Sequence, residues 1–336
     1  MTEKENYLRV VTGEMPEWLP LDCASTYPTH LFPRAVCGVM PEPYFSGHDG
    51  GKDIFGVEYT NTDSTGGMSL PTPNKFILKD IHDWRKVIKV PDINDYDFKE
   101  MARKQLANID RTQSAVLLNS HLGYFQLLMS FMGFSEGLFT MACYPEEVYD
   151  LFEYMADFFD ECALRTIDAY RPDIFGICDD VASAQSTFMS HDMYVALIKP
   201  FQMRLTEQAR KLGLPIDMHC CGKCESLIDD WLDLGVTCWN PPQDMNDLVG
   251  IKKKYGRRIA MSGCSSSKDP ANFSWSTEEE VRAEVRRCID TYAPGGGFIF
   301  RGNILGEVGD PTLPQRREWV VDEFLKYGRS YYQTHA

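Results

Sequence analysis

A histidine and a cysteine two residues apart are the residues of this sequence best suited to chemistry. They are His219 and Cys221, in the stretch DMHCCGKC at the end of a predicted strand. Because side chains two apart in a strand leave the same face, both can reach one ion. Zinc prefers imidazole and thiolate ligands, and a catalytic zinc site uses three protein ligands and one open position. The spacing therefore predicts two ligands of a zinc site.

A third ligand must come from another strand end. Cys264 follows a later predicted strand, beside a glycine that permits close backbone approach, and we predict that it completes the set. Cys178 is the second candidate, although the two carboxylates after it would raise the pKa of its thiol. If neither thiol binds, Asp180 or Gln243 becomes the leading candidate. Buried thiols that bind no metal are the simpler alternative.

The same octet contains two further patterns. Cys221 and Cys224 form a C-x-x-C pair, as in dithiol oxidoreductases, but such domains are short and carry the pair near their start. Asp217-x-His219-x-x-Gly222 matches the short pattern of cobalamin-binding domains, in which the histidine ligates cobalt. Those domains are small open sheets, unlike the long repeating pattern found here. A corrinoid-binding carrier nevertheless stays open as an alternative function.

Other polar residues at predicted strand ends are candidates for proton transfer and substrate binding. Asp179 and Asp180 are adjacent carboxylates, and we predict that one of them points into the site and acts as a general acid, with a helix N-cap as the alternative role. Four residues are predicted to bind substrate, with support of loop backbone as the alternative for each: Asn119, His121, Gln243 and Arg301. Asp53, which precedes Phe55 and Gly56, predicts a turn.

The elements that must position these residues alternate along the chain. Short apolar runs typical of strands occur at 115–119, 173–177, 214–219, 236–240, 259–263 and 297–301. Helical segments lie between them, one opened by Pro145 with acidic residues after it and another by the capping box Thr277-x-x-Glu280. Such alternation predicts parallel strands joined by right-handed crossovers.

Two architectures fit this alternation, a doubly wound open sheet and a closed (β/α)8 TIM barrel. We predict the α/β barrel, because the repeats run evenly to the C-terminus and no Gly-x-Gly-x-x-Gly fingerprint follows an early strand. Residues 1–90 are rich in Gly, Pro, Thr and Asp and predict an N-terminal extension packed on the barrel. Residues 91–336 then form the barrel, within a single domain overall.

Composition narrows the function classes. The chain of 336 residues has 34 Lys and Arg against 49 Asp and Glu, a formal charge of −15, which argues against nucleic-acid or anionic-membrane binding. The sequence shows no signal peptide and no membrane span, so we expect a cytoplasmic protein. Its 11 cysteines are then expected to be thiols.

Several stretches resemble one family over about residues 5–330. They are GKDIFGVEYT, LPTPNKFILKDIHDW, CDDVASAQSTFMSHDMYVALIKPF, GLPIDMHCCGKCESLIDDWLDLGVTCWNPPQ, YGRRIAMSGCSS and APGGGFIFRGN. Together they are similar to the uroporphyrinogen decarboxylase-like superfamily, in particular its corrinoid-dependent methyltransferase branch. The resemblance implies a single barrel with its site at the carboxyl ends of the strands, and zinc held by the H-x-C pair, here His219 and Cys221, plus a later ligand.

Two departures from the family pattern refine the expectation. Many thiol-methylating members carry a zinc cysteine where this chain reads Arg301-Gly-Asn303-Ile304, without cysteine. The decarboxylases carry an arginine-rich N-terminal motif for a substrate with many carboxylates, and EWLPLDCASTYPTHLFP has no such motif. The resemblance therefore favours methyl removal over thiol methylation, and it does not favour porphyrin decarboxylation.

We expect a zinc-dependent methyltransferase. It would move a methyl group from a small methylated substrate, a methoxyaromatic, to the Co(I) corrinoid (cobalamin) of a separate protein. That corrinoid protein would dock over the barrel mouth, with the N-terminal extension as a docking surface. The alternative is methylcobamide-dependent methylation of a small thiol or tetrahydrofolate. The sequence does not set the oligomeric state, for which a homodimer is one candidate.

Overall fold

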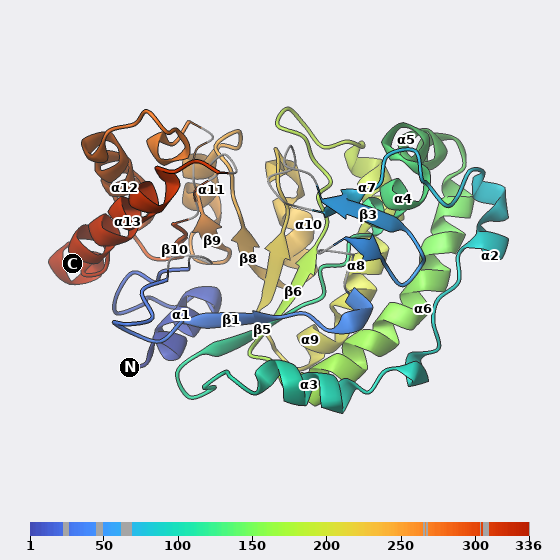
Figure 1. Cartoon of the computed structure of the whole chain (residues 1–336), viewed down its shortest axis with the longest axis horizontal. Helices are drawn as coiled ribbons and strands as arrows, with labels where there is room; N and C mark the ends of the chain where they lie inside the picture. The colour runs from blue at the N-terminus through green and yellow to red at the C-terminus, as the bar shows by residue number, and fades with distance from the viewer. Residues whose placement is uncertain are drawn as a thin grey trace.

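Seven parallel strands form a curled sheet at the centre of the fold (Figure 1). The computed structural model describes residues 1–22, 27–44, 50–61, 69–264, 266, 268–302, 304 and 309–335. In sheet order the strands are β1 (Val36–Val39), β5 (Ala115–Asn119), β6 (Ile174–Cys178), β7 (Ile216–His219), β8 (Val236–Asn240), β9 (Ala260–Gly263) and β10 (Phe298–Phe300). Sheet order follows chain order, as in a parallel α/β barrel. The predicted barrel-type fold is confirmed, and all six predicted strands form.

A segment before β1 takes the eighth position. Leu21 forms a parallel bridge with Phe300 of β10. The Asp22 amide donates to the Phe300 carbonyl at 2.9 Å, and the Phe300 amide donates to the Pro20 carbonyl at 3.0 Å. Within the described ranges, no strand ladder joins this segment to β1. The barrel therefore consists of seven strands and one bridge, where eight strands were predicted.

Residues 1–90 form part of the barrel as well as packing on it. The predicted extension contains β1, which pairs with β5, and the bridging segment at Leu21. It also contains a separate antiparallel sheet of β2 (Gly51–Lys52), β3 (Glu58–Asn61) and β4 (Ser69–Pro71). The main sheet therefore crosses the expected boundary at residue 90, because a short strand with little periodicity in its surroundings gives no clear signal.

Helices surround the sheet. They are α1 (Glu3–Val11), α2 (Trp84–Val87), α3 (Phe98–Leu106), α4 (Tyr124–Met132), α5 (Phe134–Cys143), α6 (Pro145–Tyr170), α7 (His191–Leu197), α8 (Lys199–Leu205), α9 (Glu207–Lys211), α10 (Ile228–Asp233), α11 (Leu248–Tyr255), α12 (Glu278–Tyr292), α13 (Leu313–Glu323) and α14 (Tyr331–Thr334). Both predicted helix starts are confirmed, Pro145 at α6 and the Thr277 capping box at α12. Among the described helices, none is long and apolar enough to cross a membrane.

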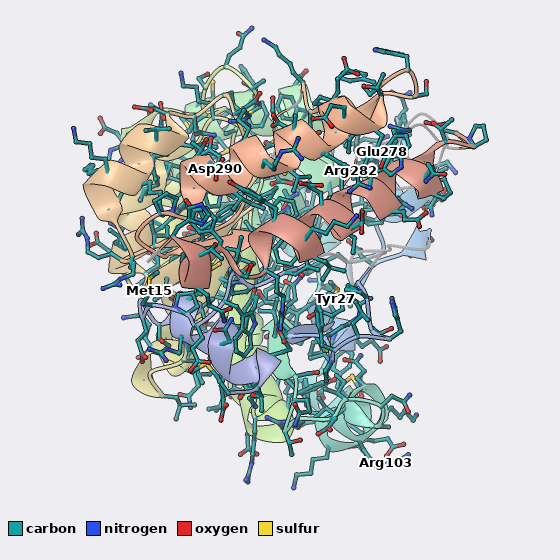
Figure 2. The ribbon with its side chains drawn as sticks, turned by 90° about the vertical axis from the view of Figure 1, so that its left-hand side faces the viewer. Met15, Tyr27, Arg103, Glu278, Arg282 and Asp290 are labelled. Carbon is teal, nitrogen blue, oxygen red and sulfur yellow. The ribbon has the colours of Figure 1, made fainter. Side chains whose placement is uncertain are left out.

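The last two long helices pack against each other through charged side chains. Figure 2 shows α12, with Glu278 and Arg282 labelled, lying beside α13. Arg282 pairs with Glu278 on its own helix and with Asp322 on α13, both at 2.6 Å. We interpret this cluster as structural, since every charge in it has an opposite partner.

A small apolar cluster fills the amino end of the barrel. Ala115, Ile174 and Ala260, at or near the starts of their strands, pack with Tyr7 and Val10 of α1. The helix therefore closes the end of the barrel where the strands begin. Polar side chains then collect at the opposite, carboxyl end of the sheet, which is where parallel barrels carry their sites.

Candidate metal centre and adjoining cavity

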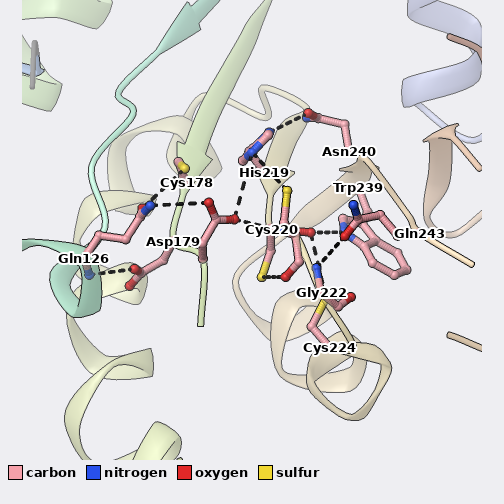
Figure 3. Close-up of polar contacts among 12 residues, drawn as sticks. Gln126, Cys178, Asp179, His219, Cys220, Gly222, Cys224, Trp239, Asn240 and Gln243 are labelled. Atoms are coloured by element: carbon pink, nitrogen blue, oxygen red, sulfur yellow. Dashed lines mark hydrogen bonds and ion pairs between the residues drawn. The ribbon is translucent and has the colours of Figure 1, made fainter. Parts of the chain in front are cut away.

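The ends of three neighbouring strands bring the candidate residues together. In the parallel register Cys178 pairs with His219, and His219 pairs with Asn240. The loops that follow β6 and β7 then carry Asp180 and Cys221 to the same edge of the sheet. Figure 3 shows His219 at this edge, with its ring directed at Asn240. The prediction that polar strand ends meet is confirmed for these residues.

Asp180, His219 and Cys221 form the one His/Cys/Asp/Glu cluster in the described part of the chain with the spacing of metal ligands. Their ligand atoms all lie within 4.8 Å of one another. His219 Nε2 lies 3.8 Å from Cys221 Sγ and 3.9 Å from Asp180 Oδ1. One nitrogen, one sulfur and one oxygen donor suit a zinc ion that keeps an open position.

The charge in this cluster also suits a cation. Burial, and then the Asp180 carboxylate, raise the pKa of the Cys221 thiol to about 12. A bound divalent cation reverses such a shift, because a coordinating thiol loses its proton. The three donors therefore fit zinc in type, spacing and charge.

A chain of hydrogen bonds orients the His219 ring. Its Nδ1 lies 2.9 Å from Asn240 Oδ1. Arg301 Nη1 donates to the same oxygen at 2.8 Å, while Asn240 Nδ2 donates to Asp217 Oδ1. Because Asn240 Oδ1 is an acceptor, His219 Nδ1 carries the proton. His219 Nε2 is then left with its lone pair directed at the cluster, as metal-binding histidines require.

Backbone amides of the loop after β7 hold it in place by donating to side chains of neighbouring loops. The Cys221 amide donates to Asp180 Oδ1 at 2.7 Å, and the Gly222 amide donates to Gln243 Oε1 at 2.7 Å. Gly222 has a φ of +90°, and a Cβ there would lie 2.5 Å from the Ala182 carbonyl oxygen. Only glycine fits this close approach between the loops after β6 and β7.

Asp179 does not face the cluster. Its carboxylate accepts the Phe125 amide at 3.1 Å and the Gln126 amide at 3.2 Å, at the first turn of α4. Gly123 is required there, since a Cβ would lie 2.3 Å from Asp179 Oδ1. Burial raises the pKa of Asp179 to about 7. The predicted catalytic acid is therefore a buried helix cap, because adjacent residues point in opposite directions and Asp180 takes the side of the site.

Neither predicted cysteine completes the metal cluster. Cys264 has a φ of +61° and is 1% exposed, and its carbonyl oxygen lies 4.0 Å from Cys288 Sγ. Cys264 is not a member of the metal cluster, so the prediction is wrong in this respect. Cys178 Sγ donates to Gln126 Oε1 at 3.6 Å. Asp180, which we predicted as an acid and as a candidate ligand if neither thiol binds, is the third member of the cluster.

The four predicted substrate-binding residues have different surroundings. Asn119 Oδ1 accepts the His121 amide at 2.8 Å, which is a turn contact. His121 lines a cavity, with its ring centroid 6.4 Å from that of His219. Gln243 supports the loop after β7 by accepting the Gly222 amide. Arg301 donates to Asn240, the residue that orients the His219 ring. Of the four, His121 is the one that borders the cavity.

A cavity of about 480 Å³ adjoins the metal cluster. Asp180, His121 and Gln126 border it, and Gln126 Nε2 donates to Asp180 Oδ2 at 3.3 Å. Eight aromatic residues line it: Tyr44, Phe55, Tyr59, Phe76, Phe125, Phe134, Phe159 and Phe188. The rings of Phe125 and Phe188 are stacked, with centroids 5.6 Å apart. This size and lining suit a small, flat, mostly apolar ligand.

Apart from Asp180 and His121, the residues of this cavity were not predicted from the sequence. They come from the small sheet, from α4 and α5, and from the loop after β6, which lie far apart along the chain. The run of aromatic residues between Phe125 and Phe134 was the available signal, and it also fits an ordinary buried helix. Asp53 forms the predicted turn, since its Oδ1 accepts the Phe55 and Val57 amides, both at 2.9 Å.

Asn240→Ala should weaken zinc binding about 10-fold to 100-fold, because the His219 ring loses the acceptor that fixes its proton and orientation. Competition with a chromogenic chelator measures the affinity. Asn119→Ala is the matched control, since it removes a turn contact on another strand, and it should leave zinc affinity unchanged. Wild-type affinity in Asn240→Ala would contradict the orienting role.

Comparison with known families gives one match over most of the chain. Residues 55–302 match the family described as Uroporphyrinogen decarboxylase (URO-D). This stretch includes all three members of the metal cluster and most of the residues that line the cavity.

Two curated proteins match part of the chain. Methylcobamide:CoM methyltransferase MtaA of Methanosarcina barkeri is 28% identical over 156 residues, which is 44% of this chain and 44% of that protein. A protein of the same description from the Fusaro strain is 27% identical over 156 residues. The similarity therefore spans less than half the length of these relatives.

A solved structure, a methyltransferase from Methanosarcina mazei, matches almost the whole chain. The TM-score is 0.60 at 13% sequence identity, over 97% of this chain and 99% of that chain. At this identity the likeness supports the barrel-type fold.

Proposed function

The chain belongs to the uroporphyrinogen decarboxylase (URO-D) family, and from this premise we propose that it is a corrinoid-dependent methyltransferase. In this proposal it moves a methyl group from a methoxyaromatic to the Co(I) corrinoid of a separate protein. The cluster of Asp180, His219 and Cys221 beside an aromatic cavity is the observation that carries it. The names of the partial relatives, which act on methylcobamide, and of the similar structure support it.

The reaction transfers CH3 from the ether oxygen to cobalt. The C–O bond breaks, the Co–C bond forms with the electron pair of Co(I), and a phenolate leaves. Zinc held by the three residues would act as a Lewis acid that stabilises the departing oxygen. The aromatic wall orients the ring and excludes water. The Gln126 side-chain amide donates a hydrogen bond to Asp180, and the side-chain oxygen of Asn240 accepts one from His219.

The corrinoid must approach from outside the chain. The cluster lies at the carboxyl ends of the strands, and we propose that the corrinoid protein docks over this end. Residues 1–90 supply the small sheet beside the cavity and are the proposed docking surface.

A direct assay tests the function. Zinc-loaded protein is mixed with cob(I)alamin, as a substitute for the partner's corrinoid, and with a panel of methoxyaromatics. We expect the absorbance spectrum of methylcobalamin to appear together with one equivalent of the phenol. No methylcobalamin from any methoxyaromatic would overturn the proposal.

A second candidate is methylation of a small thiol from methylcobamide, which is favoured by the similarity to the methylcobamide:CoM methyltransferases. The same protein is then supplied with methylcobalamin and either a small thiol or tetrahydrofolate. Faster loss of methylcobalamin with one of these acceptors than its formation from methoxyaromatics would establish the opposite direction. A carrier, the third alternative, would instead purify with bound corrinoid and be red or amber.

A further inference from the structure

The cavity has polar groups in two places. One is the metal side, where Asp180 and His121 border it. The other is formed by Asp53, Tyr59 and Ser130, which line the same cavity from the small sheet and from α4. The proposed function uses the first place and gives no role to the second.

The two carboxylate oxygens of Asp53 differ in the hydrogen bonds that they accept. Its Oδ1 accepts the Phe55 and Val57 amides, both at 2.9 Å. Its Oδ2 accepts the Tyr59 hydroxyl at 3.3 Å, which is long for a hydroxyl bound to a carboxylate. Oδ2 is therefore the oxygen suited to a further donor from the cavity.

Tyr59 and Ser130 fix the surroundings of this carboxylate. Tyr59 is 8% exposed, and its hydroxyl lies near the Ser130 side chain. Tyr59 donates its hydroxyl proton to Asp53, and Ser130 donates its own to the Leu127 carbonyl at 2.7 Å. The three residues make a small polar patch in an aromatic wall.

The charge of the lining excludes anions. Two carboxylates, Asp53 and Asp180, border the cavity, and its described lining residues include no lysine or arginine. At the Asp53 side, away from the zinc proposed at the cluster, a ligand carboxylate would meet a like charge with no lysine or arginine beside it, which costs binding free energy. A neutral ligand that carries a hydrogen-bond donor meets no such cost.

Helix α4 gives the spacing between the two places. Gln126, which donates to Asp180, and Ser130, beside Tyr59, are one turn apart, about 6 Å along the axis. That distance is comparable to the breadth of one benzene ring. A ring with its ether at the metal side can therefore present a donor on its far side to Asp53.

We propose that the substrates are neutral methoxyphenols, with the free hydroxyl donating to Asp53 Oδ2 while the methyl ether lies beside the cluster of Asp180, His219 and Cys221. Asp53 is then a specificity-determining residue. It selects a donor on the ring and rejects methoxybenzoates and other anions. This inference rests on the proposed function and adds the substrate class.

Calorimetric binding of three para-substituted probes to the protein, without corrinoid, tests the inference. They are para-methoxyphenol, para-dimethoxybenzene, which has no donor, and para-methoxybenzoate, which is anionic. We expect the phenol to bind about tenfold tighter or more than the other two, from one hydrogen bond to a charged group. Equal or tighter binding of the benzoate would overturn the inference.

Asp53→Asn removes the negative charge that we expect to select the phenol over the benzoate. The turn should remain, since a carboxamide oxygen still accepts the Phe55 and Val57 amides. We expect the phenol to lose about tenfold in affinity or more and the benzoate to gain. Para-dimethoxybenzene should bind as before, which reports an intact cavity. Unchanged preference for the phenol would overturn the role of Asp53.

Asp110→Asn is the matched control, because Asp110 accepts the Thr112 amide in a similar turn outside the cavity. All three affinities should stay at wild-type values. Binding and methyl transfer fail separately: a phenol that binds as expected but yields no methylcobalamin contradicts the proposed function alone. Methylcobalamin formed from the benzoate in preference to the phenol overturns the inference alone.

Discussion

Cys221→Ala is expected to abolish zinc binding and to lower methyl transfer about 10³-fold or more, because a Lewis acid contributes several kcal/mol to such a reaction. The fold should remain, since Cys221 lies in a loop after β7 and is half-buried. Metal analysis, the cob(I)alamin assay and a thermal melt measure the three properties. Wild-type protein should hold about one zinc per chain.

Cys264→Ala is the matched control for this variant. It removes a thiol that is buried and is not a member of the cluster, so zinc content should stay at the wild-type level. A modest loss of stability is expected from the small void. Loss of zinc from Cys264→Ala, or one full equivalent in Cys221→Ala, would contradict the ligand set.

The adjacent carboxylates Asp179 and Asp180 should respond in opposite ways to replacement by asparagine. Asp180→Asn should weaken zinc binding about 100-fold or more, because a neutral amide is a poor substitute for an anionic ligand. It should keep its stability, since its carboxamide oxygen still accepts the Cys221 amide. Chelator competition provides the affinity.

Asp179→Asn should instead keep its zinc affinity and lose about 1–3 kcal/mol of unfolding free energy. Both of its carboxylate oxygens accept backbone amides of α4, and one of them becomes an amide group that cannot accept. Chemical denaturation measures the loss. The assignment fails if Asp179→Asn releases zinc and Asp180→Asn does not.

The part of the site that could be predicted from sequence is local. His219 and Cys221 are two apart at a strand end, so their shared face follows from strand geometry alone. The six strands were recognisable as short apolar runs between helix signals, and α6 and α12 had clear start residues. These features depend on neighbours in sequence.

The third member of the cluster depended on features that a sequence does not display. Whether Asp179 or Asp180 faces the cluster is decided by α4, whose two amides, 54 and 53 positions away, bind Asp179. The left-handed backbone angle of Cys264 is equally invisible in the sequence. The aromatic cavity is formed by segments that are far apart in the sequence and come together only in the folded chain, so no sequence pattern predicts it.

The small sheet of β2, β3 and β4 is paired within itself and contributes no strand to the barrel, although Asp53, Tyr59 and Leu70 from its region line the cavity. In our proposal, ligand selection and metal binding therefore depend on separate segments of the chain, the first at residues 50–61 and 69–71 and the second at residues 178–222. Substitutions in the first segment can then change the substrate preference while the metal ligands in the second segment stay the same. A mutant library confined to the small sheet would therefore vary the substrate while it keeps the methyl-transfer reaction.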